Sequence, residues 1–347
     1  MELIRKLGNR KLGLFIGVIA LLMLPLGITN PYFMYIINLI LIYILLVLGL
    51  DLLVGYTGQV SIGHGAFFGI GAYIAAIFST KLGLSFWLTL PIAILVTAIS
   101  GFVIGFIGLK LIEEYLVMAT LAFGTIIWLV FLNWTNMTGG PMGIASIPSP
   151  PALNFGIVEL SFTQYADYYP LLLFFVIVAI IVTKLLIRSG FGRACTAIRD
   201  DELAAQSMGI PVFRTKVVMF TISAAYCGAA GTLYAHFIHV VSPETFNFTM
   251  SVTILTMVMI GGKGSIIGAV LGASLLTVFS EALRAAPELR MLIYGLLIVI
   301  MMMFFPRGIM GIIQYFRNHI VKRNLMKEKK RAANAKVDVE KEGLGYE

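Results

Sequence analysis

One stretch of the sequence, GFGRACTAIRDDELAAQSMGIPVFRTK at 190–216, gathers charged side chains in a chain that is otherwise 59% hydrophobic and 12% charged. Within it, Asp201 is a good helix N-cap and Glu202 suits the positive first turn. Gly209, followed by Pro211, predicts a helix stop. The pattern predicts a helix of about two turns, which needs a surface to pack against because so short a helix is marginal alone in water.

The predicted helix has two chemically different sides. On a helical wheel, small or apolar side chains oppose a mixed set: Ala204, Ala205 and Met208 against Glu202, Leu203 and Gln206. One side can rest on the body of the protein while the other meets a partner. Two interpretations stay open from the stretch alone. It is either a cytoplasmic coupling helix that a motor protein moves, or a solvated loop that only follows the positive-inside rule.

The sequence contains no nucleotide-binding motif that would drive transport. The nearest candidate, GGKGS at 261–265, fails the spacing of a phosphate-binding loop. Lys263 is followed by Gly264 rather than by Ser or Thr, and position 257 is Met instead of Gly. We therefore expect no cofactor in this chain and expect ATP to be used by a partner.

Ionisable residues that an ion-coupled carrier would keep inside its spans are few. The acidic ones fall near the estimated ends of apolar segments, at Asp51, Glu113, Glu114, Glu281 and Glu288. His64 is the best placed of three candidate proton carriers, the others being His236 and His239, although a hydrogen-bonded packing histidine is the expected role. The enzyme signatures HExxH and GxSxG are also missing, so we expect a protein that is not an enzyme and holds no metal.

Composition sets the class of fold that must position these residues. A mean hydropathy of +0.95 does not suit a soluble domain, because soluble domains are about 25% charged. Apolar runs long enough to cross a hydrocarbon core recur from Leu12 to Phe305. We predict an all-α polytopic integral membrane protein of about ten transmembrane or re-entrant helices. They are expected near 12–30, 33–54, 60–80, 84–108, 115–135, 168–188, 215–239, 250–260, 266–283 and 290–305, of which 250–260 is too short to cross alone.

Lys and Arg predict the orientation of these spans. Arg5, Lys6, Arg10 and Lys11 place the N-terminus in the cytoplasm, whereas 111–183 contains no Lys or Arg. We therefore expect a transmembrane domain at 1–305, with an extracytoplasmic loop at 136–167 and a cytoplasmic loop at 190–214. Residues 306–347 form a basic cytoplasmic tail. The tail lacks the aromatic interleaving of nucleic-acid readers, so we expect it to lie near anionic lipid.

A weak internal repeat accompanies the glycine-rich segments. Ser61-Ile62 followed by GAFFG at 65–69 resembles Ser265-Ile266 followed by GAVLG at 268–272. Duplicated halves are common in transporters, while small residues at such spacing also serve ordinary helix packing. A pseudo-repeat of two halves stays open.

Five motifs in register resemble one family. They are GYTGQVSIGHGAFFGIGAY at 55–73, EYLVMATLAFG at 114–124, TGGPMGI at 138–144, FGRACTAIRDDELAAQSMGI at 191–210 and IGGKGSIIGAVLGA at 260–273. Together they resemble the high-affinity branched-chain amino acid ABC importer permease family, and within it the LivM type. The likeness runs from about residue 35 to 310 in the expected order.

The resemblance implies a bacterial or archaeal inner-membrane subunit that carries Leu, Ile and Val. Its implied partners are a second homologous permease, two cytoplasmic ATPases and an extracytoplasmic substrate-binding protein. It also implies that 191–210 docks into the ATPase. The residues assigned to this coupling are Arg199, Asp200, Asp201, Glu202, Leu203, Ala204, Ala205 and Gly209.

Two departures from the family pattern bear on the substrate. Asp51 stands where the family commonly has Asn, and Ile112-Glu113 replaces the usual Arg-Gly. Because the same family serves urea and short amides, such a substrate is one alternative. A self-contained ion-coupled secondary carrier is the alternative from another class.

A zwitterionic amino acid needs its charges met by dipoles in a low-dielectric path. Helix N-termini and exposed amides near 57–65 can supply such dipoles without fixed charge. The substrate-path candidates are Gly58, Gln59, Ser61, Gly63, His64, Gly65 and Thr120. We expect alternating access, in which ATP-driven movement of the 201–209 helix swings the glycine-rich spans.

Overall fold

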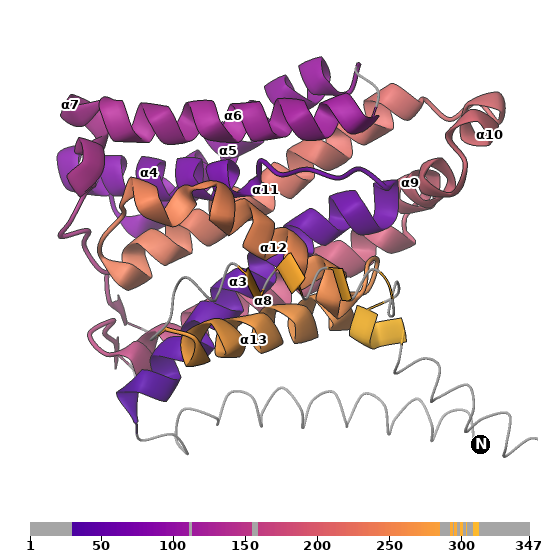
Figure 1. The fold of residues 1–347 in the computed structure, drawn as a ribbon. Coiled ribbons are helices and arrows are strands. Elements are labelled where there is room, and N and C mark those ends of the chain that lie inside the picture. Colours follow the sequence, from indigo (N-terminus) through magenta and orange to yellow (C-terminus); the bar gives the residue numbers. More distant parts are fainter. Residues whose placement is uncertain are drawn as a thin grey trace, which may run out of the picture.

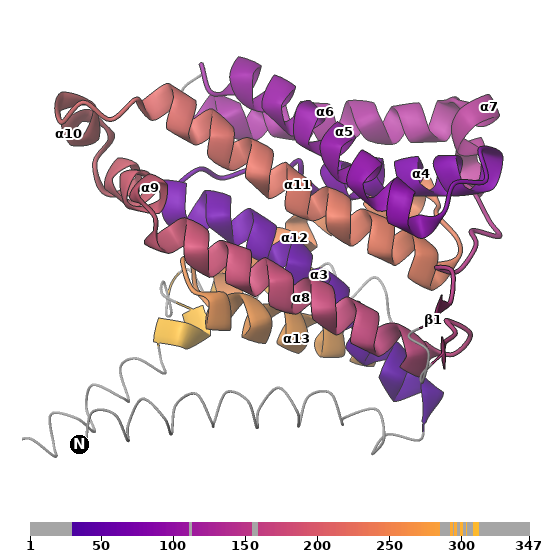
Figure 2. The same ribbon diagram turned by 180° about the vertical axis from the view of Figure 1, so that it is seen from behind.

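The computed structural model describes residues 30–110, 113–154 and 159–284, with short helical stretches between 292 and 311. The predicted span at 12–30, most of the one at 290–305 and nearly all of the basic tail lie outside the described residues. The described chain is a bundle of helices (Figures 1 and 2). The long and medium helices are α3 (Pro31–Thr57), α4 (His64–Lys81), α5 (Phe86–Gly108), α6 (Glu113–Asn133), α8 (Tyr165–Arg188), α9 (Gly190–Asp200), α11 (Val212–Ile238), α12 (Phe248–Gly261) and α13 (Ile266–Ala282).

Short elements join these helices. They are α7 (Thr135–Thr138), the 3-10 turn η1 (Gly140–Met142), the strands β1 (Leu153–Asn154) and β2 (Glu159–Leu160), α10 (Glu202–Ser207) and the 3-10 turn η2 (Pro243–Phe246). The two strands pair antiparallel, with Leu153 opposite Leu160. Among the described helices, α3, α5, α6, α8 and α11 are long and apolar enough to cross a membrane. The all-α polytopic fold is therefore confirmed.

Two helices, α3 and α11, form the centre of the bundle (Figure 1). Within the most apolar 18-residue window of each helix, 78% is buried in α3 and 61% in α11, but only 17% in α6. α11 packs against α5, α4 and α3, while α3 also packs against α8 and α13. The outer helices leave apolar side chains exposed, as expected of surfaces that face lipid.

The boundary between the second and third predicted spans differs from the prediction. α3 begins at an Asn30 N-cap with Pro31 in its first turn and runs on to Thr57, where Gly58 adopts a left-handed conformation with φ of 77°. α4 starts only at His64, so 58–63 is a non-helical linker rather than the start of a span. Asp51 lies in the last two turns of α3, close to the helix end as expected, but it is only 3% exposed and therefore buried.

The short helix expected near 250–260 is present as α12. Its 14 residues reach about 21 Å, less than the roughly 30 Å of a hydrocarbon core. The chain enters it through η2, and α13 follows after a four-residue turn at 262–265. α12 therefore depends on its neighbours to complete a crossing.

The bundle has two distinct ends. α9 and α10 project at one, which we call the α10 end, and α7 lies at the other, which we call the α7 end (Figures 1 and 2). The part of the predicted 136–167 loop from 144 to 148, at the α7 end, makes specific contacts rather than forming a plain loop. Ile144 bridges to Val241, and ring nitrogens of His236 and His239 bond to the carbonyls of Pro148 and Ile147.

Candidate functional site

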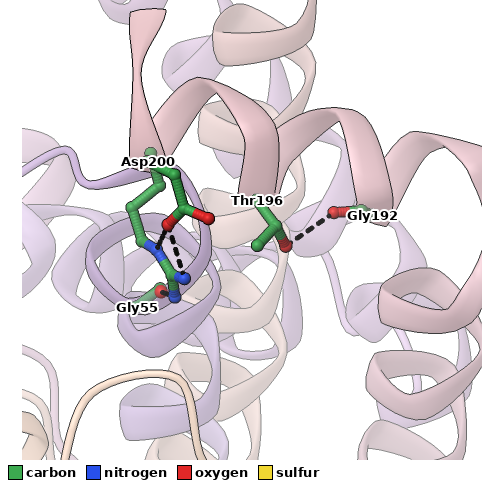
Figure 3. Close-up of polar contacts among 5 residues, drawn as sticks. Gly55, Gly192, Thr196 and Asp200 are labelled. Atoms are coloured by element: carbon green, nitrogen blue, oxygen red, sulfur yellow. Dashed lines mark hydrogen bonds and ion pairs between the residues drawn. The ribbon is translucent and has the colours of Figure 1, made fainter. Parts of the chain in front are cut away.

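The charged stretch at 190–216 contains two helices where the sequence predicted one. α9 is capped by the Ser189 hydroxyl, which accepts from Gly192 N at 3.2 Å. Thr196 Oγ1 donates to Gly192 O at 3.1 Å (Figure 3). On its buried face, burial raises the pKa of the Cys195 thiol to about 12. That thiol stays protonated at neutral pH, in line with a structural role.

α10 forms where the sequence predicted a helix of about two turns. Asp201 Oδ1 accepts from Ala204 N at 3.0 Å, which is the expected N-cap bond. Gly209 has a φ of 81°, so the helix ends in the left-handed region that favours glycine. The start and stop signals are therefore confirmed.

The two predicted sides of α10 are not separated as the wheel suggested. Ala205 is buried, but Ala204 is exposed and Met208 is 83% exposed. Leu203 is 76% exposed. Two large apolar side chains, Leu203 and Met208, thus project into solvent, and we call them the α10 tip. Exposed apolar groups on a short charged segment are typical of a docking surface.

Arg199 fastens α9 to the end of α3. Its Nη1 donates to Gly55 O at 2.8 Å, while Nε and Nη2 donate to Asp200 Oδ1 at 3.1 and 2.8 Å (Figure 3). Gly55 O belongs to the last turn of α3, whose carbonyls favour a cation. The exposed Asp200 holds the guanidinium in the orientation that reaches α3.

A second contact fastens α10 to α11. Lys216 Nζ lies 2.5 Å from Glu202 Oε2, and the Lys216 side chain is only 9% exposed, against 46% for Glu202. The sequence reasoning missed Lys216. A lone lysine at the start of an apolar run was the available signal, because such a charge needs a partner when it is buried.

Most of the substrate-path candidates have structural partners. Thr120 Oγ1 accepts from Ile62 N at 3.1 Å and donates to Val117 O at 3.0 Å, so it holds the 58–63 linker against α6. A Cβ on Gly63 would lie 2.9 Å from Thr120 O, which shows how closely the backbones approach there. Gly58 forms the cap of α3 next to Arg199.

His64 is hydrogen-bonded through both nitrogens of its ring. Ser223 Oγ donates to Gly49 O at 2.6 Å, so it accepts from His64 Nε2 at 2.7 Å. His64 Nδ1 then accepts from the Ser61 hydroxyl at 3.1 Å. Both ring nitrogens are engaged, as expected of a packing histidine rather than a proton carrier.

Gln59 is the exception in the linker. It is 1% exposed, and neither atom of its side-chain amide has a hydrogen-bond partner among the described residues. Leaving such a group unpaired costs roughly 1–3 kcal/mol. A ligand, a water molecule or a second subunit that bonded to Gln59 would remove that cost.

The first turns of α4 and α12 meet beside this linker. Gly65 N donates to Ser251 Oγ at 3.0 Å. A cavity of about 10 Å³, lined by Ile62, Asn247 and Ser251 among others, lies between them. That is room for about one water molecule. Among the described residues, no three His, Cys, Asp or Glu gather as metal ligands.

Comparison with known proteins identifies the family. Residues 32–302 match the family described as branched-chain amino acid transport system / permease component. Over 288 residues, covering 78% of this chain and 68% of the relative, the chain is 40% identical to the high-affinity branched-chain amino acid transport system permease protein LivM of Salmonella typhimurium. LivM of Escherichia coli K12 is also 40% identical, with 79% and 68% covered.

A more distant relative is the permease protein BraD of Pseudomonas aeruginosa, which is 28% identical over 78% of this chain and 91% of the relative. No solved structure matches the chain significantly. The chain belongs to the family of permease components of branched-chain amino acid transport systems.

Proposed function

We propose that this chain is the membrane-spanning permease subunit of an ABC importer for branched-chain amino acids in a bacterial or archaeal inner membrane. Its partners in this proposal are a second homologous permease, two cytoplasmic ATPases and an extracytoplasmic binding protein. Family membership and the similarity to LivM support the transport role. Hydrolysis of ATP belongs to the partner ATPases, and this chain moves the substrate.

The α10 tip is the observation that carries the mechanism. Leu203 and Met208 project from a helix too short to be stable alone. That helix is fastened to α11 by the pair of Glu202 and Lys216, and the preceding α9 is fastened to α3 by Arg199. Because α3 and α11 are the central helices, a push on α10 reaches the middle of the bundle. This is the arrangement that a coupling segment needs.

The distribution of positive charge supports a cytoplasmic location for the α10 end. Most of the Lys and Arg residues that the structure describes lie at this end of the bundle. They are Lys110, Lys184, Arg188, Arg193, Arg199, Arg214, Lys216 and Lys263. Lys81 and Arg284 lie at the other end. The α7 end, with the 136–167 loop, then faces the binding protein.

The substrate passes next to the linker and the first turns of α4 and α12. Helix N-termini there offer positive dipole ends for a carboxylate, and the unpaired Gln59 amide offers both a donor and an acceptor. The cavity beside them has room for about one water molecule, which is not enough for an amino acid. The helices must therefore move apart to let the substrate pass, which is consistent with alternating access.

The bonding of His64 and Asp51 favours this function over a self-contained secondary carrier. Both nitrogens of His64 are engaged by serines, and Asp51 Oδ1 accepts from Gly264 N at 2.7 Å. Their exposed fractions are only 1% and 3%, so neither side chain is open to a water-filled path in this conformation.

Competition for uptake tests the substrate. Vesicles containing the assembled transporter, with ATP at the ATPase face and the binding protein at the other, are supplied with labelled leucine. We expect unlabelled isoleucine and valine to compete and urea or acetamide not to compete. Competition by urea or acetamide, but not by isoleucine or valine, would replace the proposed substrate with a short amide.

A further inference from the structure

The turn between α12 and α13 is held against the last turns of α3. Gly264 N donates to Asp51 Oδ1 at 2.7 Å, and Tyr56 Oη donates to Gly264 O at 2.9 Å. Both hydrogen-bonding groups of Gly264 are therefore bound by side chains of α3. One residue of the turn is clamped from two sides.

Gly55 allows the two backbones to approach this closely. A Cβ on Gly55 would lie 2.3 Å from Gly264 N and 2.4 Å from Asp51 Oδ1, both far inside ordinary contact. Asp51 and Gly55 are one helical turn apart and face the same side of α3. The carboxylate and the bare backbone thus form one binding surface for the turn.

Arg199 reaches the same surface from α9. Its Nη1 donates to Gly55 O at 2.8 Å, and a Cβ on Gly264 would lie 3.6 Å from that Nη1. The last turns of α3 therefore lie in contact with both α9 and the α12–α13 turn. Segments 144 and 213 residues apart in sequence meet at this junction.

If position 51 served packing alone, a buried carboxylate there would cost more free energy than an apolar side chain. A carboxylate that is 3% exposed loses its hydration, and the loss is offset only by well-placed donors and a nearby cation. Here the Gly264 amide is the donor, and the Arg199 guanidinium lies at the carbonyl of Gly55, one helical turn from Asp51. A polar contact at such a position gives directional attachment that an apolar side chain does not give.

We propose that Asp51 is a positioning residue for transport, which fastens the α12–α13 turn to α3 so that α12 and α13 follow α3 when α9 is displaced. The proposal rests on the function proposed above. It requires a hydrogen-bond acceptor at position 51 and no proton transfer. α12 is too short to cross alone, so its movement depends on such an attachment.

The test measures leucine uptake per ATP hydrolysed by the assembled transporter in vesicles. Asp51→Leu removes the acceptor and leaves the Gly264 amide unpaired, so we expect the ratio to fall roughly tenfold, as for a buried donor that loses its partner. Asp51→Asn keeps an Oδ1 acceptor, and we expect a ratio within about twofold of the native one. Thr183→Val, which removes a hydroxyl bonded to Tyr226 Oη at 2.8 Å between α8 and α11, is the matched control and should leave the ratio unchanged.

Tyr56→Phe keeps the proposal testable if Asp51→Leu does not assemble. It removes only the hydroxyl that donates to Gly264 O, and we expect uptake per ATP to fall roughly threefold. A native ratio in Asp51→Leu or, if that variant does not assemble, in Tyr56→Phe would overturn the proposal. An equal loss in Asp51→Asn and Asp51→Leu would also overturn it, because the charge rather than the acceptor would then matter.

The two proposals fail in different ways. If the native transporter takes up no leucine with ATP, the proposed function fails, and uptake per ATP cannot be measured in the variants. If the native transporter works and Asp51→Leu keeps the native ratio, only the role of Asp51 fails.

Discussion

The α9–α10 segment and the 58–63 linker nearly touch, yet they are built with different chemistry. A Cβ on Gly58, where the linker begins, would lie 3.4 Å from Arg199 Cγ. The α9–α10 segment is exposed and attached through charged groups, as in the pair of Glu202 and Lys216. The linker is attached through neutral groups, as in the bond from Ile62 N to Thr120 Oγ1.

The difference follows from the surroundings of each region. Charged side chains that keep one side in water lose little hydration, so they can serve as attachment points at the α10 end. Inside the bundle an unpaired charge is expensive, and in the linker neutral dipoles bind the backbone and, in our proposal, the substrate. In our proposal, the α9–α10 segment receives the movement of the ATPases through charged attachments, and the linker meets the substrate through neutral ones.

A charge placed on the α10 tip is expected to have the largest effect on ATPase binding. We expect Met208→Asp to weaken ATPase binding by about 2 kcal/mol or roughly 30-fold, as for a residue at the centre of an interface. Binding of the purified ATPase to the solubilised permease pair measures the effect.

Met142→Asp is the matched control, because Met142 is 87% exposed but lies at the α7 end. It should leave ATPase binding unchanged. Equal losses in both variants would show that added charge, rather than the α10 tip, weakens the complex.

Removing the partner of Lys216 is expected to have the next largest effect. Glu202→Ala leaves a nearly buried ammonium unpaired, which should lower the free energy of unfolding by about 1–2 kcal/mol. The value is below that of a fully buried pair because Glu202 is half-exposed. Thermal unfolding in detergent measures it, and the added change Lys216→Met should restore part of the loss. If neither variant changed the thermal stability, the pair of Glu202 and Lys216 would not fasten α10 to α11.

The left-handed Gly209 offers a smaller perturbation. Nothing lies within 4 Å of a Cβ at this position, so a substitution there acts through the backbone alone. Gly209→Val should cost about 1 kcal/mol and weaken ATPase binding roughly fivefold, while membrane insertion is kept. Gly209→Asn, which tolerates positive φ better, should lose less. A smaller loss with Val than with Asn would contradict the backbone explanation.

The smallest expected effect concerns the linker. Gln59→Leu removes an unpaired buried amide, so stability should stay within about 0.5 kcal/mol of native or rise. The KM for leucine uptake should rise roughly threefold, the value of a modest hydrogen bond to the substrate. A stable variant with native KM would remove Gln59 from the substrate path.

Local signals in the sequence predicted α10 well. Asp201 and Gly209 act through neighbouring backbone groups, so their roles can be read from spacing. α9 was missed because Gly190 and Gly192 argue against a helix there, and its Ser189 cap and buried face outweigh that preference. Hydropathy gave the order of the apolar segments but placed the start of α4 too early.

The remaining errors involve contacts between distant residues. The linker leaves helical geometry where Thr120 of α6 binds Ile62, and the pair of Glu202 and Lys216 forms only after α10 folds back on α11. The junction joins Asp51 and Gly55, one turn apart on α3, to Gly264, which no periodicity connects to them. Such contacts are fixed by packing of the whole bundle, and local sequence marks one partner at most, as it does for Lys216.

The central claim is that energy for transport enters this chain from ATPase partners through α9 and α10. Leucine accumulation is measured in vesicles that contain either the assembled transporter or this chain alone, with ATP or with a proton gradient. We predict accumulation only for the assembly with ATP, and its loss when the assembly carries Met208→Asp. Accumulation by the chain alone, driven by the proton gradient, would contradict the account.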